Sequence, residues 1–470
     1  MTHEYRLLID GQLVAGVGSF AVINPANEQV VAMSPKADAA QLNAAVAAAR
    51  RAFPAWAAKT QDERAALVND IADRLMARAD EFARLLTAEQ GKPLDQAHYE
   101  IVGAVFTLKG FAQMRVAEKV LRSEGGNQVF EHRTPLGVCA AITPWNFPII
   151  LLCNKLGPAL VTGNTMVAKP APTTPLTSLL LGEIVNDVLP AGVVNIIADE
   201  NELGPLLSGH PDVAKVGFTG STATGKKVMA SAAGTVKRVT LELGGNDAAI
   251  VLDDMPARLA AEKVYQGAMT NAGQICVAIK RAYVHESIYD EFLTEIIRIA
   301  DAAIVDDGTK QGVTIGPVQN RMQFDKVSAL LADAREKGQI LAGGAPLDRP
   351  GFFIPPTIVA GLDDDAALVR EEQFGPVLPV LKFTDIDEVI ARANDSEYGL
   401  AGTVWGKDTA RAIAIARRID TGTVWVNQHL AIDTHIPFRG VKQSGLGAEL
   451  GEAGLLEYTQ AHIVNAVELA

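Results

Sequence analysis

The sequence contains one cysteine whose neighbours suit a nucleophile. Cys276 lies in the apolar segment NAGQICVA (271–278), between small residues. A cysteine thiolate attacks electrophilic carbon readily, so this segment predicts covalent catalysis. The alternative is an inert core cysteine, because a free thiol often packs as a small hydrophobe. The other motifs of the chain decide between the two interpretations.

Two further side chains could assist such a nucleophile. Asn146 lies in TPWNFP (143–148), where two prolines stiffen the loop, and an amide held in one orientation can stabilise an oxyanion. Glu242 lies at the end of an apolar stretch in LELGGN (241–246). A carboxylate in apolar surroundings has a raised pKa, which suits a general base. A turn asparagine and a glutamate on a solvated strand edge are the structural alternatives.

Three more segments could contact a nucleotide. FTGSTATGKK (218–227) follows a predicted strand and opens a helix, so its amides could receive a phosphate. Lys227 stands where a P-loop requires Ser or Thr, which disfavours a phosphotransferase; an ordinary strand-to-helix turn is the other alternative. Lys169 ends another strand, where a cation suits ribose or phosphate or is simply solvated. Glu371 and Glu372 begin EEQFGP, either as functional carboxylates or as a surface charge pair.

Composition narrows the class of protein. The 470 residues are 48% hydrophobic and 21% charged, which is typical of a globular chain of two or three domains. The net charge of −13 and the lack of a basic block exclude nucleic acid and anionic lipid as partners. Three cysteines without paired spacing predict neither a disulfide framework nor a metal site. No signal peptide or spanning segment is found, so we expect a soluble, cytoplasmic protein.

The patterning predicts an α/β fold. Short strands are expected within residues 5–31, and Asp38 with Gln41 resembles a capping box before a helix over 42–53. Helical patterns follow over 63–90 and 96–120.

Strands then alternate with helices, which predicts βαβ units, a mostly parallel sheet and ligands at the carboxyl ends of its strands. The predicted strands are 137–142, 165–169, 193–197, 213–218 and 239–243, with a second set at 248–252, 281–285, 403–405 and 423–426. A strand-like tail at 461–467 could pair with another subunit.

Together these motifs resemble the aldehyde dehydrogenase superfamily. PWNFP, FTGSTATG, LELGGN, GQIC, EEQFGP and the late PFRG with KQSG occur in the family's order over essentially the whole chain, and Cys276 follows Glu242 by 34 residues, which suits the family. The resemblance implies a Rossmann-like NAD(P)-binding domain (1–120 and 136–244), an α/β catalytic domain (245–445) and a small β oligomerisation element (121–135 and 446–470). It also implies a homodimer or homotetramer.

The resemblance assigns catalytic roles. Cys276 is the nucleophile that forms a thiohemiacetal with the aldehyde, and Asn146 holds the oxyanion together with the Cys276 amide. Glu242 activates the water that hydrolyses the thioester, with Lys155 and Glu449 supporting proton transfer. Relatives that release acyl-CoA typically lack this base, so we expect hydrolytic release. An inactive cofactor-binding scaffold is disfavoured by the intact Cys276, Glu242 and Asn146.

The implied cofactor is NAD, with NADP also usable. Pro172 stands where NAD-preferring relatives often carry a glutamate against the adenosine ribose, so NADP is less excluded than usual. We therefore expect NAD first, with some use of NADP. The implied cofactor-binding residues are Thr143, Pro144, Trp145, Lys169, Pro172, Gly220, Ser221, Gly225, Leu243, Gly244, Glu372 and Phe374.

The implied substrate tunnel is mostly apolar, which predicts medium-chain aliphatic or aromatic aldehydes. A semialdehyde, the alternative, would need a cation from Arg439, His429 or His435. Arg439 stands in PFRG where PFGG is commoner in the family, and it bears either on the pocket mouth or on a subunit contact. The tunnel positions are Phe147, Leu151, Asn154, Ile275, Val277, Leu430, Ile432 and Phe438.

Overall fold

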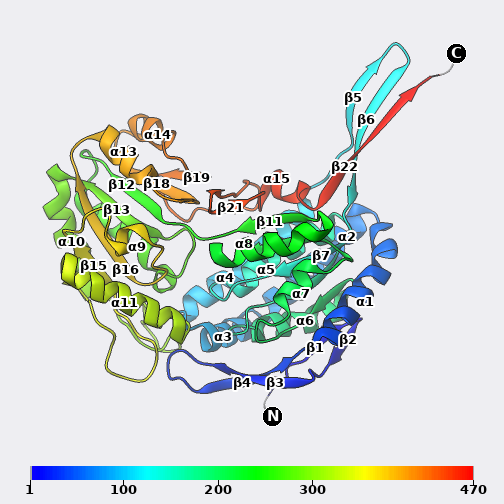
Figure 1. Cartoon of the computed structure of the whole chain (residues 1–470), viewed down its shortest axis with the longest axis horizontal. Helices are drawn as coiled ribbons and strands as arrows, with labels where there is room; N and C mark the ends of the chain where they lie inside the picture. The colour runs from blue at the N-terminus through cyan, green and yellow to red at the C-terminus, as the bar shows by residue number, and fades with distance from the viewer. Residues whose placement is uncertain (1–2, 469–470) are drawn as a thin grey trace.

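The computed structural model describes residues 3–468 as two α/β lobes and a protruding three-stranded sheet (Figure 1). Residues 1–2 and 469–470, which the predicted ranges 1–120 and 446–470 include, lie outside the described residues. Within residues 3–468, no helix combines the length and the apolar character needed to cross a membrane.

The first lobe is built on an eight-stranded sheet of order β2-β1-β9-β8-β7-β10-β11-β21. Its five central strands run parallel, and their carboxyl ends therefore meet at one edge. Strands β7 and β8 are buried along their whole length, as expected where helices cover both faces of a parallel sheet. The strands are β1 (Leu7–Ile9), β2 (Gln12–Val14), β7 (Val138–Ile142), β8 (Thr165–Lys169), β9 (Val194–Ile196), β10 (Val213–Thr219), β11 (Arg238–Glu242) and β21 (Gly445–Leu446).

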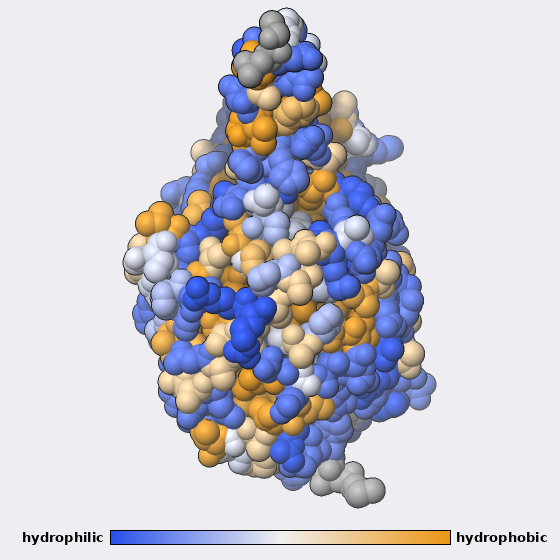
Figure 2. Space-filling view, turned by 90° about the vertical axis from the view of Figure 1, so that its right-hand side faces the viewer, coloured by the Kyte–Doolittle hydropathy of each residue, from blue (hydrophilic) through white to orange (hydrophobic). Residues whose placement is uncertain are grey.

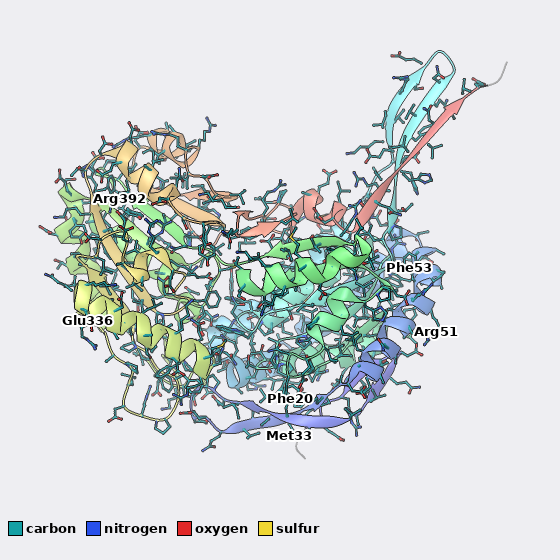
Figure 3. All side chains as sticks on the ribbon, in the orientation of Figure 1. Phe20, Met33, Arg51, Phe53, Glu336 and Arg392 are labelled. Carbon is teal, nitrogen blue, oxygen red and sulfur yellow. The ribbon has the colours of Figure 1, made fainter. Side chains whose placement is uncertain are left out.

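Eight helices pack around this sheet and share one apolar core with it. They are α1 (Ala39–Ala57), α2 (Gln61–Ala77), α3 (Ala79–Gln90), α4 (Leu94–Gln113), α5 (Pro148–Val161), α6 (Leu176–Val188), α7 (Gly204–Gly209) and α8 (Thr222–Ala232). A ribbon of β3 (Gly18–Ile23) and β4 (Val30–Lys36) runs beneath both lobes, with Phe20 buried and Met33 exposed (Figure 3).

The second lobe holds a seven-stranded sheet of order β14-β15-β16-β13-β12-β18-β19, parallel except for the β14–β15 pair. Separate apolar clusters cover its two faces. The strands are β12 (Asp247–Val251), β13 (Ile279–His285), β14 (Gln339–Ala342), β15 (Thr357–Ala360), β16 (Val377–Phe383), β18 (Ala401–Trp405) and β19 (Thr423–Val426). The helices are α9 (Ala257–Met269), α10 (Tyr289–Asp301), α11 (Arg321–Lys337), α12 (Ala367–Arg370), α13 (Ile386–Asn394) and α14 (Thr409–Ala416).

The protruding sheet has the order β22-β6-β5. It joins β5 (Lys119–Glu124) and β6 (Asn127–Pro135) to β22 (Thr459–Val467), after the short helix α15 (Gly451–Leu456). The chain's tail thus pairs along its whole length with β6 of the same chain. Figure 2 shows this sheet projecting from the body. Its exposed apolar side chains are Val120, Leu121, Ile463, Val464 and Val467.

The predicted parallel α/β architecture is confirmed, and each of the nine strands predicted between 137 and 426 is present within two residues at either end. The second sheet also contains β14, β15 and β16, which the patterning did not predict.

Two helix predictions are wrong in part. The segment 63–90, predicted as one helix, forms two helices that meet at Arg78. The Arg78 side chain binds Glu81 and Glu183. The pattern over 96–120 ends at Gln113, and residues from Lys119 onward form β5, because pairing with β6 outweighs local helix preference.

The helix start at Asp38 is confirmed, since its carboxylate accepts a hydrogen bond from the Gln41 amide. The capping box is not completed, because the Gln41 side chain binds the Ala15 carbonyl instead.

Candidate active site

The turn before Cys276 is backbone-strained and tightly packed. Asn271, Ala272 and Gly273 have φ angles of 53°, 54° and 71°, in the left-handed region. For an alanine this conformation costs about 1–2 kcal/mol, so surrounding contacts must impose it. A Cβ on Gly273 would lie 2.2 Å from the Gly375 carbonyl oxygen, which leaves room for glycine alone. The turn therefore presents Cys276 in one fixed position.

Buried amides hold this turn against the first lobe. The Gln90 side chain donates to Asn271 Oδ1 (3.1 Å), and Asn271 Nδ2 donates to the Asn146 carbonyl (3.2 Å). The Gln274 side chain accepts from the Gln319 amide at 2.8 Å. These bonds join the Cys276 turn of the second lobe to the Asn146 loop of the first, although the two are far apart in sequence.

Asn146 is held by hydrogen bonds to both its side chain and its backbone carbonyl. Its Nδ2 donates to the Gln274 carbonyl at 3.0 Å, and only 4% of the residue is exposed. Its own carbonyl accepts from Lys92 Nζ at 2.8 Å, and Lys92 forms a fully buried ion pair with Glu100. An amide nitrogen carries two hydrogens, so one remains for an oxyanion beside Cys276.

Glu242 is a buried carboxylate without hydrogen bonds. It ends β11, is 4% exposed, and neither carboxylate oxygen has a hydrogen-bond partner. Burial raises the pKa of Glu242 well above its usual value, and the negative charge of Glu449 raises it further. Lys155 and Arg439 oppose that shift. A carboxyl with a raised pKa and free oxygens is suited to take a proton from a reactant.

Lys155 and Glu449 form an ion pair whose charges act on the Glu242 carboxyl. Lys155 Nζ lies 2.6 Å from Glu449 Oε1 and donates to Thr219 Oγ1, also at 2.6 Å. Thr219 faces Glu242 across the β10–β11 register. Asn154, expected in the tunnel, donates to Glu449 Oε2 at 3.4 Å. The sequence reasoning missed Thr219, which its place at the carboxyl end of a predicted strand could have indicated.

The Cys276 thiol is half-buried. Burial raises its pKa to about 12, and Glu372, Asp247 and Glu242 add to the rise. Lys280 opposes it. The raised pKa favours the protonated thiol, so the proton has to leave as the bond to substrate forms.

An apolar cluster surrounds the sulfur. It packs Cys276 with Trp425, Leu400 and with five of the predicted tunnel residues, namely Phe147, Ile275, Val277, Leu430 and Phe438. Ile432 lies outside this cluster and is 52% exposed, and Leu151 is half-buried on α5. The residues beside the sulfur are thus those expected of an apolar pocket.

Glu372 is held at the crossing between the lobes. Its Oε1 accepts from the Gly245 amide at 3.0 Å, and a Cβ on Gly244 would lie 2.4 Å from Oε2, so a side chain there would displace the carboxylate. Phe374, with a left-handed φ of 50°, meets Trp145 edge to face at 5.3 Å. Four of the predicted cofactor residues thus meet in two pairs, Gly244 with Glu372 and Trp145 with Phe374.

The turn from β10 into α8 is shaped for close backbone packing. The exposed Ser221 caps α8 by accepting from the Thr224 amide, and the Gly220 amide donates to the Glu242 carbonyl. A Cβ on Gly225 would lie 2.4 Å from Leu243, so glycine lets the helix rest on that leucine. The first-turn amides of α8 remain suited to a phosphate group of a dinucleotide.

Lys169 and Thr143 lie at the carboxyl ends of neighbouring strands, and the Thr143 amide donates to the Lys169 carbonyl. Lys169 Nζ lies 2.7 Å from Asp199 Oδ1, with both side chains almost fully buried. Asp199 Oδ2 accepts from the Leu203 amide, and Oδ1 faces the Lys169 ammonium. The sequence reasoning missed Asp199, although an acid two residues after a predicted strand was visible. Of the two prolines predicted to contact the cofactor, Pro172 is half-buried three residues after Lys169, and Pro144 directly follows Thr143.

Ser444, after Thr219 and Asp199, is a third residue to which the sequence motifs gave no role. Its hydroxyl donates to the Gly244 carbonyl (2.6 Å) and accepts from the Gly399 amide (2.9 Å), while its carbonyl accepts from the Leu243 amide. These hydrogen bonds hold Leu243 and Gly244, the two residues after Glu242, in place.

The profile of the Aldehyde dehydrogenase family matches residues 14–464. The chain belongs to the aldehyde dehydrogenase family. It is 39% identical to aldehyde dehydrogenase 1A1 of Rattus norvegicus over 95% of this chain and 91% of that protein. It is also 39% identical to succinate-semialdehyde dehydrogenase [NADP(+)] GabD of Escherichia coli, covering 97% of this chain and 96% of that protein.

Solved structures agree with this assignment. Betaine aldehyde dehydrogenase (betB) of Staphylococcus aureus, in complex with NAD+, superposes with a TM-score of 0.95 at 34% identity, covering 98% of this chain and 94% of that one. The chain is therefore an oxidoreductase that oxidises aldehydes with NAD(P). Within residues 3–468, no group of three or more His, Cys, Asp or Glu side chains could hold a metal ion.

Proposed function

We propose that this enzyme oxidises medium-chain aliphatic or aromatic aldehydes to carboxylic acids, with Cys276 as nucleophile. The apolar cluster around Cys276 carries the proposal, because Phe147, Val277 and Phe438 offer an alkyl or aryl group contact without a buried charge.

In the first half-reaction, the Cys276 sulfur bonds to the carbonyl carbon and its proton leaves toward Glu242, whose unpartnered oxygens can accept it. The thiohemiacetal oxyanion is held by the free hydrogen of Asn146 Nδ2 and by the Cys276 amide. The bound cofactor supplies the nicotinamide ring that takes the hydride, and a thioester to Cys276 remains.

Glu242 first passes the Cys276 proton on and returns to the carboxylate form. In the second half-reaction it takes a proton from water as the water oxygen attacks the thioester carbon, and the Cys276 thiolate leaves and takes up a proton as the acid forms. The Lys155–Glu449 pair, next to Glu242, offers the route by which the proton moves away. Glu242 therefore supports hydrolytic release over transfer of the acyl group to CoA.

For the cofactor, Lys169 and Glu372 would hold ribose hydroxyls, the α8 turn at Gly220 and Ser221 the pyrophosphate, and Phe374 the nicotinamide side. The Asp199 carboxylate supports NAD over NADP, because its oxygens have lone pairs left to accept a hydrogen bond from a ribose hydroxyl, whereas its charge repels a 2′-phosphate. Asp199 would thus supply the carboxylate that is absent at position 172, so that NAD is preferred and NADP is used less well.

A semialdehyde is the second candidate substrate. Arg439 supports it, because this cation follows Phe438 of the apolar cluster and its charge lowers the pKa of Glu242, so it could also attract the carboxylate of a semialdehyde. His429 is a poor cation, since burial lowers its pKa to about 4 and its Nε2 binds the Val277 carbonyl. His435 is exposed and pairs with Asp433.

We further propose the domain ranges 1–120 with 136–244, 245–445, and 121–135 with 446–470, and a homodimer or homotetramer located in the cytoplasm. The exposed apolar residues of the β22-β6-β5 sheet support its use in assembly, because such a surface is normally covered by a partner.

The test is a panel of octanal, benzaldehyde and succinic semialdehyde with NAD and NADP, followed by absorbance of the reduced cofactor. We expect octanal and benzaldehyde to have the highest kcat/KM, and Cys276→Ala to abolish turnover. Preference for succinic semialdehyde selects the second candidate, and full turnover by Cys276→Ala refutes the mechanism.

A further inference from the structure

Lys280 is a fully buried lysine beneath the nucleophile. It is the second residue of β13, and only 1% of its side chain is exposed. Its Nζ donates to the carbonyls of Ile275 (2.8 Å), Cys276 (2.7 Å) and Ala278 (3.4 Å). One ammonium thus binds the backbone on both sides of the cysteine.

The ammonium charge is only partly compensated. The nearest carboxylate oxygen, Glu372 Oε1, lies 3.6 Å away, beyond hydrogen-bond distance, and already accepts from the Gly245 amide. Neutral carbonyls satisfy the N–H groups without cancelling the charge. A positive charge therefore lies next to the Cys276 backbone on a side chain that is itself buried, where Coulomb interactions are strong.

The other charged groups around the thiol are acidic. Glu242 approaches from β11, Asp247 from β12 and Glu372 from the loop before β16, and each raises the pKa of Cys276. Lys280 is the group that lowers it. Removal of the lysine would leave the forming thiolate among three carboxyl groups.

We propose that Lys280 is the positioning residue of the nucleophile: its ammonium fixes the 275–278 loop through three carbonyls and supplies the positive charge that favours the Cys276 thiolate. The inference rests on the proposed role of Cys276. It also links the two sites, because the same ammonium lies between the Cys276 loop and Glu372, which we assign to the cofactor.

The experiment measures the rate of Cys276 alkylation by iodoacetamide between pH 7 and 10 without cofactor, with the adduct located by mass spectrometry. Lys280→Gln keeps an N–H donor but removes the charge, and Lys280→Arg keeps the charge. We expect Lys280→Gln to react at least tenfold more slowly at each pH, because the thiolate fraction falls, and Lys280→Arg to stay within about threefold of wild type.

The matched control is Lys215→Gln, since Lys215 is also fully buried but bonds Thr240. It should leave the alkylation profile unchanged. A wild-type profile in Lys280→Gln overturns the proposal. If that variant does not fold, the double variant Lys280→Gln/Glu372→Gln, which removes both charges of the pair, is compared with Glu372→Gln: slower alkylation in the double variant supports the proposal, and equal rates overturn it. Loss of the Cys276 role would instead show as turnover by Cys276→Ala.

Discussion

Replacement of Asp199 by asparagine should change the cofactor preference. The asparagine keeps the size of the side chain and an oxygen for the Leu203 amide, but it removes the charge beside Lys169. Lys169 then remains buried as an unpaired cation, which favours an anionic ligand group. We expect the ratio Kd(NADP)/Kd(NAD) to fall at least tenfold.

The magnitude follows from the ion-pair geometry. Asp199 Oδ1 lies 2.7 Å from Lys169 Nζ. A 2′-phosphate oxygen that pairs with Nζ at about 2.9 Å would lie within about 6 Å of Oδ1. Two unit charges at about 6 Å repel by about 3 kcal/mol at an effective dielectric constant of about 20. Salt and small side-chain shifts reduce this value, and about 1.4 kcal/mol already gives a tenfold change.

The assay is titration of the cofactor-free enzyme with NAD and NADP by calorimetry at fixed ionic strength. Glu202→Gln is the control, because Glu202 lies in the same loop but is exposed and paired with Lys36. It should leave the ratio unchanged. An unchanged ratio in Asp199→Asn refutes the role of Asp199, whereas a wild-type protein that binds neither dinucleotide refutes the cofactor site itself.

The remaining predictions concern catalysis and assembly. Glu242→Gln should lower steady-state turnover by about 10²–10⁴-fold and should also slow the first burst of reduced cofactor, because Glu242 accepts a proton in both half-reactions; a turnover near wild type would contradict its role as the base. The pKa of Glu242 is raised in the folded protein, so the stability of the wild type falls as the pH rises from the pKa of an unfolded glutamate, about 4.3, toward the raised pKa of the folded protein. Glu242→Gln should therefore raise Tm at pH 8 and have little effect on Tm near pH 4. Asn146→Ala should lower kcat by about 10²–10³-fold with a small change in KM, and a kcat near wild type would exclude it from the oxyanion site. Val464→Glu should dissociate the oligomer in sedimentation velocity, with exposed Met322→Glu on α11 as control; an unchanged sedimentation coefficient would place the interface elsewhere.

Much of the fold could be predicted because its signals are local. Strands such as Thr165–Lys169 are short apolar runs bounded by turns. The alternation of such strands with helices was enough to predict both parallel sheets. The failures arose where distant contacts outweighed local preference. The helix predicted over 96–120 ends early at Gln113, and its last two predicted residues, Lys119 and Val120, instead start β5, because β6 is available as a pairing partner. The pattern over 63–90 is continuous, but the backbone leaves helical geometry at Arg78, whose side chain binds Glu81 and the distant Glu183.

For the site, the sequence alone determined which residues are chemically capable: a cysteine in an apolar segment, an amide in a stiff loop and an acid at a strand end. The tertiary structure decided which side chains surround them. It placed Lys280 under Cys276, Lys155 with Glu449, and Asp199 against Lys169. The charge next to each group, and hence its pKa and its ligand preference, depends on atoms within a few ångströms that come from distant segments. No local pattern in the chain encodes those distances.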